Sequence, residues 1–137
     1  MKLFLDSSAF AKRFVDEPGS LNVERLCAQA DELGLSVICV PEIISALNRR
    51  LREGRLTRQE YAQAKRCIAS DVRDADIVNL TPEIVQLSID VLEDHPLRAM
   101  DAIHVASALA WEADTFASSD LRQVTAAKAA GLRTESV

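Results

Sequence analysis

Long apolar runs are missing from this sequence of 137 residues, and none reaches the roughly 18 residues that a membrane-spanning helix needs. The short apolar stretch at the start of the chain is closed by Asp6, too early for the hydrophobic segment of a signal peptide. Cysteines are few, odd in number and without a CxxC spacing, which indicates free thiols rather than a disulfide framework or a zinc site. We therefore expect a cytoplasmic protein with no membrane association.

Glycine and proline are also scarce, with four of each, and there is no Gly/Ser linker, internal repeat or low-complexity tract. The connections between secondary-structure elements must then be short. Hydrophobic residues make up 48% and charged residues 27% of the chain, a balance typical of a folded protein rather than a disordered one. The length suits one domain, and we expect a single domain over residues 1–137.

An excess of basic residues is absent as well, since 16 Lys and Arg stand against 21 Asp and Glu, for a net charge of −5. Taken alone, this balance argues against nucleic-acid binding. The charges are unevenly distributed, however: residues 49–66 hold seven basic and two acidic residues, and residues 74–94 hold six acidic and no basic ones. Because of this uneven distribution, the acidic total does not by itself exclude a nucleic acid as a ligand.

Short apolar segments alternate with segments of helical periodicity. Strands are predicted over 2–6, 35–40, 77–80, 115–118 and 132–137, and helices over 8–15, 20–32, 41–53, 58–72, 82–94, 99–113 and 120–130. Ser7 or Ser8, Ser20 and Thr57 are expected to cap helices, and Thr57 with Glu60 matches a capping box. Thr81-Pro82 is expected to begin a helix, and Gly34 to close the second one. The alternation predicts an α/β fold: three α/β/α layers with a central, mostly parallel sheet. The carboxyl ends of its strands meet at one edge, where ligands bind.

Four acidic residues fall at that edge. Asp6 ends the first strand, and Glu42 lies in the first turn of the helix after the second strand. Asp101 lies near the start of an alanine-rich helix, and Asp120 follows the fourth strand. Each alone is explained by helix capping or by the helix dipole. Two carboxylates ~6 Å apart repel by roughly 3 kcal/mol at an effective dielectric constant of about 20, so four together need a cation. Oxygen ligands favour Mg²⁺, with Mn²⁺ as a substitute, and such a site suits phosphodiester hydrolysis.

The segments LDSSAFAKRF, PEIISALNR, RAMDAIHVASALA and FASSDLRQV…AAKAAGL resemble, in this order and approximate spacing, the four motifs of PIN-domain ribonucleases. Within that family the chain looks most like the VapC toxins of bacterial VapBC toxin–antitoxin pairs. The resemblance covers essentially the whole chain, and the ordered set of motifs is more specific than any one of them. It implies catalytic and metal-binding acids at Asp6, Glu42, Asp101 and Asp120.

The same resemblance assigns supporting hydroxyl groups to Ser8 and to Ser118, where the family usually has threonine. It implies Mg²⁺-dependent cleavage of RNA by an activated water, leaving a 5′-phosphate and a 3′-hydroxyl. It also implies a homodimer, or a heteromeric complex with a cognate antitoxin that covers the site.

Several further residues have both a functional and a structural interpretation. His104 lies three residues after Asp101 on the same helical face, but a single histidine in an apolar helix is more often packed than metal-bound. Lys12, Arg13 and Arg49 lie near the first acids, where they either contact RNA phosphates or are simply solvated. The apolar side of residues 43–72 is large enough to suggest a docking face for an antitoxin or a second subunit.

Two other functions remain open at this point. The first is another Mg²⁺-dependent phosphoryl-transfer enzyme, such as a phosphatase, although Asp6 is followed by two serines rather than by the second aspartate of phosphoaspartate enzymes. The second is a non-catalytic, PIN-like RNA-binding module. Such a module would be expected to have lost an acid, whereas all four are present.

Overall fold

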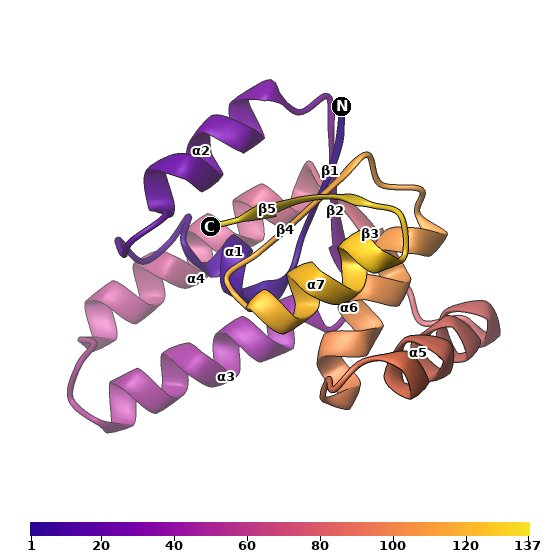
Figure 1. The fold of residues 1–137 in the computed structure, drawn as a ribbon. Coiled ribbons are helices and arrows are strands. Elements are labelled where there is room, and N and C mark those ends of the chain that lie inside the picture. Colours follow the sequence, from indigo (N-terminus) through magenta and orange to yellow (C-terminus); the bar gives the residue numbers. More distant parts are fainter.

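The computed structural model describes residues 1–137 and contains one sheet of five strands (Figure 1). The order across the sheet is β3-β2-β1-β4-β5, and every neighbouring pair is parallel. The strands are β1 (Lys2–Leu5), β2 (Glu32–Ser36), β3 (Asp76–Val78), β4 (Thr115–Ser118) and β5 (Arg133–Ser136). The first strand is therefore central, and the expected α/β/α fold is confirmed.

Seven helices cover the two faces of the sheet. They are α1 (Ser7–Ala11), α2 (Ser20–Gln29), α3 (Cys39–Arg52), α4 (Arg58–Arg73), α5 (Pro82–Asp94), α6 (Ala99–Ala110) and α7 (Leu121–Ala129). The first four pack on one face and the last three on the other. In Figure 1, α3 and α4 form a hairpin whose connecting loop points away from the sheet. None of the helices is long and apolar enough to cross a bilayer.

The alternation of side chains along β1 divides the core into two parts. Leu3 and Leu5 join a cluster with residues of α1 to α4, whereas Phe4 points to the opposite face, into a cluster with α5 to α7. The rings of Phe4 and Phe116 stack there with centroids 6.1 Å apart. Each such buried side chain contributes roughly 1.5–3 kcal/mol, so the sheet is held from both sides.

Local signals set several helix ends as predicted. Thr57 and Glu60 form the expected capping box at the start of α4, with both hydrogen bonds 3.0 Å long. Thr81 caps α5, which has Pro82 in its first turn. The chain reverses after α3 and α7 at Gly54 and Gly131, whose φ angles of 72° and 99° favour glycine.

The prediction for the segment around Gly34 was wrong. Helix α2 ends at Gln29, and β2 begins at Glu32, so Gly34 lies inside a strand instead of closing a helix. A Cβ at this position would lie 2.7 Å from Cε3 of Trp111, which explains the glycine by close packing. Helix α3 accordingly begins at Cys39, in what was predicted to be strand.

Three other boundaries also differ from the prediction. Helix α1 ends at Ala11, β3 covers Asp76–Val78, and α6 ends at Ala110. Ser20 is the first residue of α2, whose cap residue Gly19 makes no side-chain capping bond. After Ala11 the chain continues in turns whose amides bond three residues back, as Lys12 does to Ala9, so the apolar pattern extends beyond the regular helix.

The structure narrows the docking face expected from residues 43–72. The side chains at its centre are buried in the chain's own core, together with Leu3 and Leu5 of the sheet: Ile43, Leu47, Ala64 and Ile68. The centre of the apolar side therefore packs within the chain's own core, although a hollow of about 540 Å³ remains open beside Leu56, Ala64 and Cys67.

Candidate active site

A cleft of about 500 Å³ opens beside the carboxyl ends of β1 and β4. Its walls come from α1, α3, α6, α7 and the loop after α1. All four acids singled out from the sequence line it: Asp6, Glu42, Asp101 and Asp120. The parallel sheet thus brings together four carboxylates that are far apart in the chain.

Asp6 is the most enclosed of these acids, with 1% of its surface exposed. Its Oδ1 accepts hydrogen bonds from the Ala9 amide at 2.9 Å and from Ser8 Oγ at 2.8 Å, so Asp6, and not Ser7 or Ser8, caps α1. Burial raises the pKa of Asp6, although the charge of His104 and these hydrogen bonds act in the opposite direction. A carboxylate in this position would be stabilised by a cation.

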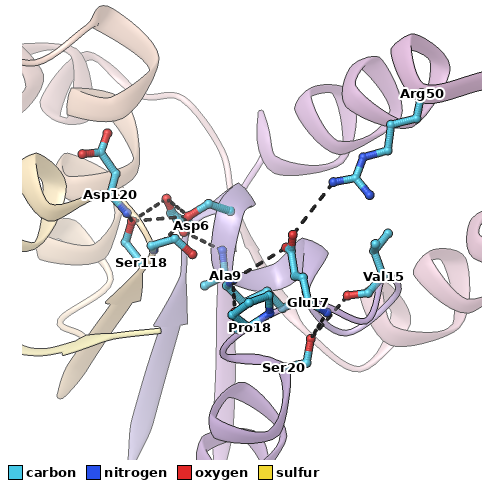
Figure 2. A network of polar contacts seen from close by, with 12 residues as sticks. Asp6, Ala9, Val15, Glu17, Pro18, Ser20, Arg50, Ser118 and Asp120 are labelled. Carbon is cyan, nitrogen blue, oxygen red and sulfur yellow. Dashed lines mark hydrogen bonds and ion pairs between the residues drawn. The ribbon is translucent and has the colours of Figure 1, made fainter. Parts of the chain in front are cut away.

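The two supporting serines hold Asp6 from both sides. Ser118 donates a hydrogen bond of 2.8 Å to Oδ2 of Asp6, and Ser8 donates to both carboxylate oxygens. The Asp120 amide in turn donates to Ser118 Oγ at 2.9 Å (Figure 2). Ser118 therefore connects the ends of β1 and β4 and links the backbone of one acid to the side chain of another.

Glu42 forms a separate cluster with His104 and Ser7. Nε2 of His104 lies 2.5 Å from Oε1 of Glu42, and Ser7 Oγ donates to the same oxygen at 2.7 Å. Burial alone would raise the pKa of Glu42, but the hydrogen bonds from His104 and Ser7 and the charge of His104 leave that pKa below its ordinary value. His104 is thus a packed partner of Glu42, a contact between α6 and α3 that spacing along one helix does not reveal.

Asp101 lies in the first turn of α6, and Asp120 is the cap residue that precedes α7. The Arg98 amide and Gln123 Nε2 donate to the two oxygens of Asp101, at 3.3 Å and 3.1 Å. Asp120 caps α7 through the Arg122 amide at 2.9 Å, and the Arg122 guanidinium lies 3.5 Å from the same carboxylate. Capping and cleft-lining are therefore compatible roles for these two acids.

The residue types in the cleft fit a hard divalent cation, since the acids supply only oxygen ligands and Asp6 is buried with a raised pKa. No three side chains of the types that bind metals already form a metal-binding cluster. Each acid is instead occupied by protein donors, as with Glu42 and His104. A cation would have to replace some of these donors by rotation of the more exposed carboxylates.

Of the basic residues predicted near the site, Lys12 lines the cleft and is 8% exposed. Its Nζ donates to the Pro18 carbonyl at 2.5 Å and lies 3.7 Å from Glu17 Oε1. The other oxygen of Glu17 lies 3.9 Å from Nη2 of Arg50, which reaches over from α3 (Figure 2). Glu17 and Arg50 were not singled out from the sequence, because Glu17 precedes a Pro-Gly break and Arg50 belongs to a general basic run.

The other two basic candidates lie outside the cleft. Arg13 pairs with Asp71 at 2.6 Å, on α4. Arg49 is exposed and does not line the cleft, whereas its neighbour Arg50 does. One position along a helix changes the direction of a side chain by about 100°, which separates these two arginines.

The fold and the cleft define a class: a three-layer α/β/α protein with an oxygen-rich acidic site at the carboxyl edge of a parallel sheet. Residues 3–129 match the family model of the PIN domain. Ribonuclease VapC45 of Mycobacterium tuberculosis is 35% identical over 108 residues, which are 79% of this chain and 75% of that protein. The chain therefore belongs to the PIN-domain family, among the VapC ribonucleases.

Solved structures show the same fold at lower identity. VapC20 of Mycobacterium tuberculosis, a toxin that cleaves the sarcin–ricin loop, has a TM-score of 0.70 at 18% identity and covers 95% of both chains. VapBC2 from Rickettsia felis, solved with a DNA fragment from its promoter, has a TM-score of 0.71 at 12% identity, over 100% of this chain and 99% of that one.

Proposed function

We propose that this chain is a toxin ribonuclease that hydrolyses RNA phosphodiester bonds in the cleft of Asp6, Glu42, Asp101 and Asp120. The observation that carries the proposal is the convergence of these four acids, from four separate segments, on one cleft of about 500 Å³. The 35% identity to Ribonuclease VapC45 supports RNA as the substrate class. Neither a phosphatase nor a non-catalytic module is favoured by a specific feature of the cleft.

The acids would hold Mg²⁺, or Mn²⁺ in its place. When bound, such an ion polarises a water molecule for attack on phosphorus and neutralises charge that develops on the phosphate. Asp6 is fixed for this role by Ser8 and Ser118, and Glu42 by His104 and Ser7. The protein contribution is thus to orient carboxylates before the substrate arrives.

Lys12 and Arg50 would contact phosphates of the RNA on the wall of the cleft that Glu17 occupies. Both side chains line the same cleft as the four acids, so a bound strand would pass between the metal site and these two cations. Arg13 and Arg49 would contribute only to the wider positive field around the hairpin.

A cognate antitoxin would cover the cleft, and the toxin would act in the cytoplasm as a homodimer or as a heteromeric complex with that antitoxin. The similarity of the chain to VapBC2, a toxin–antitoxin complex solved on promoter DNA, supports a partner of this kind.

RNA cleavage by the purified protein tests the proposal. We expect cleavage with Mg²⁺ or Mn²⁺, its loss with EDTA, and at least about 100-fold lower rates for Asp6→Asn and Asp101→Asn, because each loses a ligand carboxylate. Asp114→Asn, on the opposite end of β4, is the matched control and should cleave like the wild type. Cleavage that persists in EDTA or in Asp101→Asn would overturn the proposal.

A further inference from the structure

Gln123 lies in the first turn of α7 and lines the same cleft as the four acids. Only 4% of its surface is exposed. Its Nε2 donates a 3.1 Å hydrogen bond to Oδ1 of Asp101, whose other oxygen accepts from the Arg98 amide. The carboxylate of Asp101 is thus held from two helices, and Gln123 supplies the contact that comes from outside α6.

The other end of the Gln123 amide has no partner, since Oε1 is buried and accepts no hydrogen bond. Turning the amide over would not help, because Oε1 would then face the Asp101 carboxylate, which offers no proton. A buried polar atom without a partner costs about 1–3 kcal/mol, comparable with the gain from the bond to a charged acceptor. The amide therefore adds little to the stability of the fold, and its one evident effect is on Asp101.

We propose that Gln123 is a positioning residue, which holds the Asp101 carboxylate in the orientation that binds the divalent cation. This inference rests on the proposed function. A carboxylate that is oriented beforehand loses less conformational freedom when it binds a ligand. Partners of this kind typically change metal affinity by about 10- to 100-fold, without touching the metal themselves.

The test is Gln123→Met, which keeps the length of the side chain and removes both polar atoms. Mn²⁺ affinity is measured by titration calorimetry, and the unfolding temperature is measured without metal. We expect affinity to fall by about 10-fold or more while the unfolding temperature of the metal-free variant stays equal to the wild type or rises. A merely structural role would give the reverse: unchanged affinity and a lower unfolding temperature, which overturns the inference.

Gln86→Met is the matched control, because Gln86 donates to Oδ1 of Asp90 at the same 3.1 Å on the exposed side of α5. It should leave the Mn²⁺ affinity unchanged, and an equal loss in this control would also overturn the inference. Asp101→Asn separates the two proposals. Suppose that the wild type binds Mn²⁺ and Asp101→Asn does not. An unchanged Mn²⁺ affinity in Gln123→Met then rules out the positioning role of Gln123 and leaves the proposed function standing. If the wild type binds no Mn²⁺, both proposals fall.

Discussion

At the scale of single residues, burial and cation binding favour opposite protonation states of the Asp6 carboxyl group. It is almost fully buried at the end of the central strand, and burial raises its pKa despite the charge of His104 and the donors around it. The folded protein therefore binds more protons than the unfolded chain at pH values between the ordinary and the raised pKa. Across that window the free energy of unfolding decreases as the pH rises. Without a cation, the same carboxylate that is suited to bind one destabilises the fold.

Asp6→Asn should therefore stabilise the metal-free protein at pH 7–8, by about 1 kcal/mol or roughly 2–4 °C in Tm, while abolishing Mn²⁺-dependent stabilisation. The gain should shrink as the pH falls through the raised pKa, because Asp6 is then neutral in the wild type as well. Thermal unfolding from pH 4 to 8 measures this, with the exposed Asp16→Asn as control. A lower Tm for Asp6→Asn at pH 8 would show that the serines and His104 fully offset the buried charge.

At the scale of elements, the parts of the fold that depend on nearby residues could be predicted from the sequence. The capping box of Thr57 and Glu60 and the Thr81-Pro82 start are complete within one turn of helix. Gly34 could not be assigned correctly, since a glycine after a helical pattern is a common helix end and the ring of Trp111 comes from a distant segment. Asp6, Glu42 and Asp120 could be placed at one edge of the sheet for a related reason, because each follows a strand and the order of the elements is readable from the sequence. The bonds of Glu42 to His104 and of Asp101 to Gln123 could not be predicted, because they connect separate helices.

The close approach at β2 predicts that Gly34→Ala is destabilising. The new methyl group would lie 2.7 to 2.9 Å from three ring atoms of Trp111, and we expect a loss of about 1–3 kcal/mol in the free energy of unfolding. Urea denaturation of Gly34→Ala, Trp111→Leu and the double variant measures it. The penalty of Gly34→Ala should be much smaller in the Trp111→Leu background, because the ring that the methyl group would meet is then absent. Equal penalties in both backgrounds would contradict this account of the glycine.

At the scale of the whole molecule, charge is separated across the two faces of the sheet. The basic run of residues 49–66 lies on the α3–α4 hairpin, on one face, and the acidic run of residues 74–94 lies on β3 and α5, with α5 on the other. Although the net charge is −5, the α3–α4 hairpin carries an excess of positive charge. Arg50 lies where this hairpin meets the cleft. The affinity for RNA that comes from phosphate contacts falls as the salt concentration rises, so the contribution of one arginine can be measured from this dependence.

Arg50→Gln should raise the KM for RNA with little change in kcat, and reduce the slope of log affinity against log salt concentration by about 0.7. Arg55→Gln is the matched control, because Arg55 belongs to the same basic run but is 65% exposed and pairs with Glu53. Cleavage kinetics at several salt concentrations measure both variants. The assignment of Arg50 to the RNA path fails if the two variants give the same slope.

The central position of β1 has a consequence for synthesis. β1 is flanked on one side by β4, and Asp6 receives a hydrogen bond from Ser118, which lies 112 residues later in the sequence. A nascent chain that stops before β4 has neither this bond nor Asp120, so it cannot assemble the cleft. Synthesis must therefore pass β4 and Asp120 before the four acids, which come from segments as far apart as Asp6 and Asp120, can line one cleft.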